Sequence, residues 1–83
     1  MDVTSLVRFV ACSLVDKPDA VDVREVEGPE SVVIELRVDP DDMGKVIGRQ
    51  GKIAKALRTI VKSAAAKGDK KYNIEIVEKG ESA

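Results

Sequence analysis

Two glycines that bracket an arginine and a glutamine form the chemically most distinctive segment of this 83-residue chain. Gly48 and Gly51 flank Arg49 and Gln50, and lysines stand on both sides of the group. Glycines leave the backbone uncluttered, and the amide N–H groups at the start of a following helix point outward, where they suit an anion. Arg49 would add charge and Gln50 a neutral hydrogen-bonding group. These residue types predict a loop that contacts a phosphodiester backbone.

Two other glycine motifs that bind phosphate are excluded by their positions. A nucleotide-hydrolase loop that used Gly51 and Lys52 as its Gly-Lys pair would need glycine in place of Val46 and Ser or Thr in place of Ile53. A dinucleotide-binding fingerprint that ended at Gly51 would also need glycine in place of Val46. Neither class of nucleotide-binding protein fits the chain.

The basic residues gather in one part of the sequence. Between Met43 and Lys71 there are nine basic residues and one acidic residue, a net charge of +8, whereas the rest of the chain carries −9. The formal net charge is only −1, but an electrostatic footprint is local. One face could therefore attract a polyanion; the alternative is a solvated, lysine-rich helix without a partner.

The composition excludes several kinds of chemistry. There is no histidine and only one cysteine, so the chain offers no Ser-His or Cys-His pair, no histidine zinc site and no internal disulfide. Cys12 lies in an apolar stretch and is expected to be an inert core residue in a reducing cytoplasm. The longest apolar run, Phe9–Cys12, is far shorter than the roughly 20 residues of a membrane span. We expect no catalysis, no cofactor, no metal and no membrane span.

Hydrophobic periodicity and turn residues predict an α-β-β-α-α-β order. The expected elements are a helix over 3–15, strands over 21–26 and 31–38 that form a hairpin, a short helix from residue 40 to before Gly48, a longer helix from Gly51 to about Lys67 that ends at Gly68-Asp69, and a strand over 72–77. This order is typical of an α+β domain, a three-stranded sheet with helices packed on one face. Residues 1–78 are expected to form a single domain and 79–83 a polar tail.

The longer helix predicts how the basic residues are placed. At about 100° per residue, its aliphatic residues fall on one arc and its cations on the opposite side. The cations are Lys52, Lys55, Arg58 and Lys62. The cationic side therefore starts beside the glycine loop and remains free for phosphate contacts.

Two groups of residues allow alternative interpretations. Asp39, Asp41 and Asp42 could form a metal or acid–base cluster, but we expect Asp39 to cap the short helix and the other two to favour the positive end of its dipole. Leu6, Phe9 and Val10 on the first helix could form a partner-binding face, but core packing is the expectation.

The segment Val46–Gly51 resembles the Ile-Gly-x-x-Gly core of the KH RNA-binding domain, a module whose Gly-x-x-Gly loop clamps four backbone nucleotides. The element order resembles the bacterial type II KH fold, whose sheet is mixed. The longer run from Asp39 to Arg58 is similar to the KhpA family of small, stand-alone bacterial KH proteins. The resemblance covers nearly the whole chain.

The resemblance implies a role for each residue of the motif. Gly48, Arg49, Gln50 and Gly51 would contact the sugar-phosphate backbone of single-stranded RNA, and three lysines would flank them. Aliphatic residues would line or support a groove for about four unpaired bases. The lysines are Lys45, Lys52 and Lys55; the aliphatic residues are Val46, Ile47 and Ile53, with Ile34 or Leu36 on the neighbouring strand.

The resemblance also implies partners. The chain would be a bacterial RNA chaperone or post-transcriptional regulator in the cytoplasm that forms a homodimer, or a heterodimer with a larger KhpB/Jag-type KH protein. In that family the pair is linked to cell elongation (cell shape) and to envelope homeostasis, including cell wall organisation. The alternative is a protein-interaction or dimerisation module in which RNA binding is vestigial.

Overall fold

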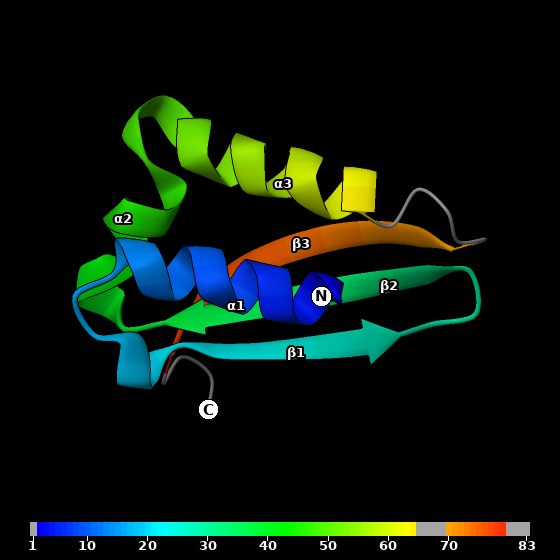
Figure 1. Ribbon diagram of the computed structural model, residues 1–83, viewed down its shortest axis with the longest axis horizontal. Coiled ribbons are helices and arrows are strands. Elements are labelled where there is room, and N and C mark those ends of the chain that lie inside the picture. Colours follow the sequence, from blue (N-terminus) through cyan, green and yellow to red (C-terminus); the bar gives the residue numbers. More distant parts are fainter. Residues whose placement is uncertain (1, 65–69, 80–83) are drawn as a thin grey trace.

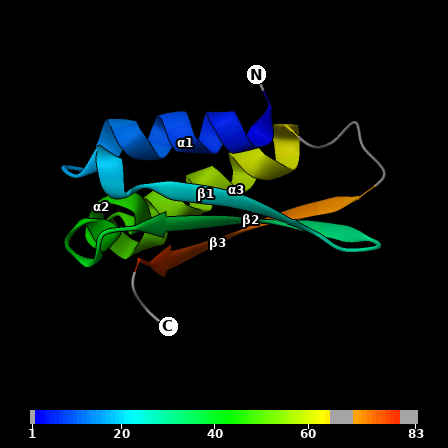
Figure 2. The ribbon, with the colours of Figure 1, turned by 90° about the horizontal axis from the view of Figure 1, so that it is seen from below.

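In a computed structural model, which describes residues 2–64 and 70–79, a three-stranded sheet carries its helices on one face (Figures 1 and 2). The order of elements and the α+β class confirm the type II KH fold expected from the sequence. The elements are α1 (Val3–Leu14), β1 (Asp22–Glu27), β2 (Ser31–Val38), α2 (Met43–Ile47), α3 (Lys52–Ala64) and β3 (Lys71–Glu78), with 3₁₀ turns at Pro18–Ala20, Pro40–Asp42 and Arg49–Gly51.

Strand β2 is the centre of a mixed sheet. It pairs antiparallel with β1, as the hairpin prediction requires, and parallel with β3. A parallel pair needs a crossover connection, and here the segment that contains α2 and α3 supplies it. The alternating apolar residues of β2 point to the helices and are at most 1% exposed. Because β2 holds both neighbours, it fixes the sheet on which α3 rests.

The core lies between the sheet and the helices. Val7 and Ala11 contribute the buried face of α1, and Leu57 and Val61 that of α3. The short helix α2 adds the fully buried Val46. Both long helices therefore present a narrow apolar face inward, and the predicted cations of α3 are exposed on the opposite side.

The boundaries differ little from those predicted. Strand β1 is shifted by one residue, β2 matches, and β3 is one residue longer at each end. The predicted end of the third helix at Gly68-Asp69 lies outside the described residues. So do residues 80–83 of the predicted tail; the amide of Lys79 donates to the Val38 carbonyl oxygen, at 2.7 Å.

Phe9 does not pack in the core, contrary to the prediction, since it is 64% exposed. The buried face of α1 is centred on Val7 and Ala11. Phe9 lies two positions from each, which places it about 200° away around the helix. Its ring therefore points to the solvent-facing side of α1.

Asp42 has a further role beyond the one expected. Asp39 caps the Pro40–Asp42 turn by accepting from the Asp41 amide at 2.9 Å, as predicted, but Asp42 makes no cap hydrogen bond to α2. Its side chain is 1% exposed and accepts from the backbone amides of Asp16 at 3.2 Å and Lys17 at 3.0 Å. Asp42 thus ties the segment after α1 to the beginning of α2.

The hydrogen bonds control the protonation of this buried carboxylate. Burial acts to raise the pKa of Asp42, but the two amide donors and the nearby Lys45 ammonium outweigh burial and hold the pKa below its ordinary value of 3.8. A group with a depressed folded pKa stabilises the fold above its unfolded pKa, and that stability is lost as the pH falls through the folded pKa.

We expect Asp42→Asn to lower the free energy of unfolding at pH 7 and to remove part of the wild-type loss of stability on acidification below about pH 4. Asp41→Asn is the matched control, because the Asp41 side chain is 79% exposed, and it should stay near wild type at pH 7. Urea denaturation across a pH series measures both effects. Equal unfolding free energies for the two variants would contradict this role of Asp42.

Candidate nucleic-acid interface

The loop between α2 and α3 has a backbone that few residues other than glycine can adopt. Helix α2 ends at Ile47; the next residue, Gly48, has φ 78° and ψ 174°, and Gly51 has φ 76°. Between them Gln50 also has a positive φ, 58°, which is uncommon for a residue with a side chain. The loop is closed by the Gly51 amide, which donates to the Gly48 carbonyl oxygen at 3.2 Å. Arg49 and Gln50 are exposed at the tip.

Gly48 also has a packing role. A Cβ atom at this position would lie 2.6 Å from Cγ1 of Ile53 and 2.9 Å from the Ile53 amide nitrogen. The side chain of Ile53, on the first turn of α3, therefore fills the space next to the Gly48 backbone. At Gly51, by contrast, a Cβ would meet nothing within 4 Å. The close approach between α2 and α3 thus depends on Gly48.

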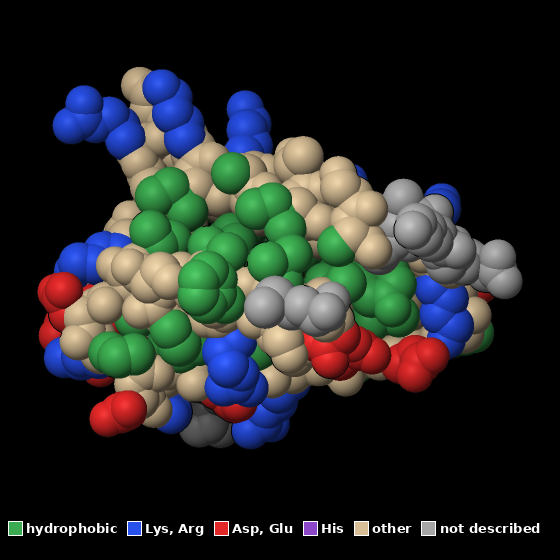
Figure 3. Space-filling model, in the orientation of Figure 1, with side chains coloured by type: hydrophobic (Ala, Val, Ile, Leu, Met, Phe, Trp, Pro, Cys, Tyr) green, Lys and Arg blue, Asp and Glu red, His purple; other side chains and the backbone are tan. Residues whose placement is uncertain are grey.

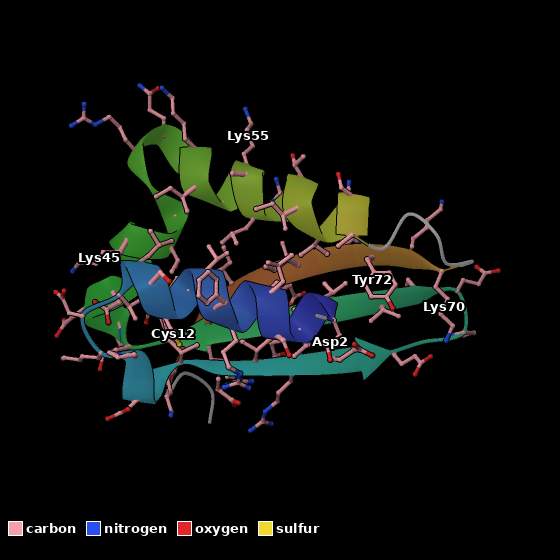
Figure 4. All side chains as sticks on the ribbon, viewed as in Figure 1. Asp2, Cys12, Lys45, Lys55, Lys70 and Tyr72 are labelled. Atoms are coloured by element: carbon pink, nitrogen blue, oxygen red, sulfur yellow. The ribbon has the colours of Figure 1, made fainter. Side chains whose placement is uncertain are left out.

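Five cations extend from the loop along α3: Arg49, Lys52, Lys55, Arg58 and Lys62. All five are exposed, and within the described part of the chain none has a carboxylate oxygen within 4.0 Å. Figure 3 shows basic side chains standing out at the corner formed by the loop, and in Figure 4 Lys55 points away from the sheet. The sequence between Met43 and Ala64 contains no acidic residue. This surface therefore carries uncompensated positive charge.

Lys45 is placed differently from the other predicted lysines. Its Nζ lies 3.0 Å from Oδ2 of Asp16 and 3.4 Å from Oδ1 of Asp42. The Asp16 carboxylate is the main reason that the pKa of Lys45 is raised. In Figure 4 Lys45 lies where α1 and α2 meet, on another side of the molecule from Lys55. The structure thus groups Lys52 and Lys55 with the loop and Lys45 with the carboxylates that anchor α2.

The predicted aliphatic residues lie at two depths. Val46, like Ile34 and Leu36 of β2, is fully buried, so these side chains can support a groove but not line it. Ile47 and Ile53 are partly exposed and pack against the core beside the loop. Only this pair remains available at the surface for an apolar contact with a base.

Residues 2–64 and 70–79 include no group of three or more Asp, Glu or Cys side chains that could hold a metal ion. Over the same residues, no helix combines the length and the apolar character needed to cross a membrane. An open hollow of about 560 Å³ lies at the β1–β2 turn, and residues of the glycine loop do not line it.

Alanine at each loop glycine separates strain from packing. Gly51→Ala should cost only the penalty of a left-handed backbone, about 1–2 kcal/mol. Gly48→Ala should destabilise the fold more, because it incurs the same backbone penalty and also places a methyl group against Ile53. Such overpacking costs a further amount of about 1–3 kcal/mol. Urea denaturation of the two variants measures the difference. A Gly51→Ala variant less stable than Gly48→Ala would contradict the packing role of Gly48.

Comparison with known proteins gives relatives of nearly the same length. The chain is 61% identical over 72 residues to the RNA-binding protein KhpA of Clostridium perfringens. The matched segment covers 87% of this chain and 96% of that protein. It is 53% identical over 73 residues to the RNA-binding protein KhpA of Aquifex aeolicus. Here the matched segment covers 88% of this chain and 92% of that protein.

Solved structures show the same fold in a larger protein. Era of Aquifex aeolicus matches with a TM-score of 0.61 at 21% identity, and the match covers 92% of this chain but only 30% of Era. A family model described as the KH domain of KhpA and KhpB matches residues 4–76, which include both loop glycines and all of α3. With this match and these identities, the chain belongs to the KhpA/KhpB family of KH domains.

Proposed function

We propose that this protein binds single-stranded RNA at the Gly48–Gly51 loop and performs no catalysis. The observation that carries the proposal is the combination of an exposed Gly-x-x-Gly loop with cations that have no carboxylate partner in the described structure. Unpaired cations can exchange their counterions for phosphates without first breaking an ion pair. The relatives named RNA-binding protein KhpA support the same function.

The residues divide into three roles in this proposal. Arg49 and Gln50, with the flanking glycines, contact the sugar-phosphate backbone, and Lys52 and Lys55 add phosphate contacts. Ile47 and Ile53 face about four unpaired bases, above a floor supported by the buried Val46. Lys45 lies near the site, but its ammonium group is held in ion pairs with Asp16 and Asp42. A phosphate would have to compete with these two carboxylates for Lys45.

The loop variant Arg49→Asp/Gln50→Asp should lose RNA binding, because two carboxylates would repel phosphate at the tip of the loop. Fluorescence anisotropy with a short unstructured RNA measures the affinity over a salt series. For the wild type, log affinity should fall against log salt with a slope of about −2 to −3, as expected for three or four phosphates on a single strand.

A matched pair of lysines is the control for this experiment. Lys52→Gln should make the slope shallower by about 0.7, the value for one phosphate contact, whereas Lys45→Gln should leave it nearly unchanged. Equal binding by wild type and by the double loop variant would move RNA contact elsewhere on the molecule.

We also propose that the protein forms a homodimer, or a heterodimer with a KhpB/Jag-type KH protein. Phe9 supports this: it is 64% exposed on α1 and is one of two large apolar side chains that are strongly exposed in the described structure. Apolar side chains also gather on the helical face of the molecule in Figure 3. The family model spans both KhpA and KhpB domains. The alternative is that association through this surface is the main function. The chain would then be a protein-interaction module in which RNA binding is vestigial.

We expect Phe9→Ser to weaken self-association, since it removes an exposed apolar anchor and disturbs no buried residue. Sedimentation velocity over a range of micromolar concentrations measures the monomer–dimer equilibrium, with Arg8→Ser, an exposed neighbour on α1, as the control. A wild-type chain that stays monomeric at high micromolar concentration would contradict the homodimer.

A single small groove reads few bases, so selectivity is expected to come from partners and avidity. In this proposal the protein is a cytoplasmic RNA chaperone or post-transcriptional regulator that acts through paired KH domains. Effects on cell shape and cell wall organisation would follow from the RNAs it binds.

A further inference from the structure

The cations of α3 continue well past the residues assigned to the RNA groove. Arg58 and Lys62 follow Lys55 at spacings of three and four residues, and the three fall within an arc of about 60° on the helix. Leu57 and Val61 of the same helix point into the core. Lys55, Arg58 and Lys62 therefore form a straight cationic stripe on the outside of α3, and we name these three residues the α3 stripe.

The α3 stripe is continuous with the loop. Helix α3 begins at Lys52, directly after Gly51, and ten residues at about 1.5 Å each place Lys62 roughly 15 Å further along the helix axis. Neighbouring cations of the stripe are about 4.5–6 Å apart along this axis. A nucleic-acid strand that leaves the loop toward the C-terminal end of α3 meets a cation at nearly every nucleotide.

The pairing of charges distinguishes the stripe from five basic residues elsewhere in the described structure. Lys17, Arg24, Arg37, Lys45 and Lys70 each lie beside a carboxylate. Within the described residues, Arg58 and Lys62 have no such partner, and the helix that carries them contains no acidic residue. A solvated helix face without a ligand commonly mixes charges of both signs. The stripe instead has a single sign over its whole length.

The surface around the stripe favours nucleic acid over an acidic protein. Protein interfaces rely on buried aromatic or aliphatic anchors at their centre. In the described structure the large apolar side chains that are strongly exposed are Phe9 and Val26, on α1 and β1. The exposed residues between the cations of α3 are small, such as Thr59 and Ser63. A nucleic-acid strand, by contrast, can bind through the cations alone, without an apolar anchor.

We propose that the RNA site extends beyond the loop along the α3 stripe, so that the protein holds a single strand of more than four nucleotides, with Arg58 and Lys62 as additional phosphate contacts. The inference rests on the proposed RNA binding at the loop. It adds that affinity and salt dependence grow with RNA length until the strand reaches Lys62.

The test compares a 4-nucleotide and a 12-nucleotide unstructured RNA by fluorescence anisotropy over a salt series. On the longer RNA, Arg58→Gln/Lys62→Gln should weaken binding roughly three- to tenfold at low salt and make the slope of log affinity against log salt shallower by about 1.4. On the 4-nucleotide RNA the same variant should match the wild type. Comparing variant and wild type on one RNA cancels the larger number of binding registers on the longer strand.

The control variant Arg8→Gln/Lys79→Gln removes the same charge from two exposed cations outside α3 and should bind both RNAs as the wild type does. An Arg58→Gln/Lys62→Gln variant that matches the wild type on the 12-nucleotide RNA would overturn the extended site, as would equal weakening on both RNAs. If binding of an acidic peptide such as polyglutamate required Arg58 and Lys62 while binding of the long RNA did not, the stripe would be assigned to a protein partner. Absence of wild-type binding to either RNA would overturn the proposed function itself.

Discussion

The missing Cβ of Gly48 is the constraint on which the site depends. Because Gly48 has no side chain, Ile53 packs directly against its backbone, and the first turn of α3 closes onto the end of α2. This contact places Arg49 and Gln50 at the tip of a tight turn and starts α3 beside them. The glycine loop and the cationic side of α3 are therefore one continuous surface.

The distribution of ion pairs determines which cations are free for a ligand. The acidic residues around α2 are engaged in contacts within the fold. Asp42 accepts hydrogen bonds from the amides of Asp16 and Lys17, and the Lys45 ammonium lies between two carboxylates. On α3 there is no acid to perform this role. An overall acidic chain can thus present a local basic surface, since salt screens exposed charges that lie more than about one Debye length away, near 10 Å at 0.1 M salt.

Features set by local spacing could be predicted from the sequence. The alternation in β2 gave its bounds, and the two loop glycines marked the break between helices. Contacts between distant segments could not be predicted in this way. Asp42 and Asp16 are 26 residues apart, so nothing in the spacing of the acids showed that Asp42 is buried or that Lys45 is paired. The exposure of Phe9 follows from helix phase, which the apolar run around it concealed.

The most direct test of the account is an NMR titration of ¹⁵N-labelled wild-type protein with a short single-stranded RNA. We predict that the largest amide shift changes occur from Gly48 to Ala54 and that residues on α1 and on β1 change little. Changes concentrated on α1 around Phe9, or on the open face of the sheet, with the loop amides unmoved, would contradict the assignment of the RNA site to the glycine loop.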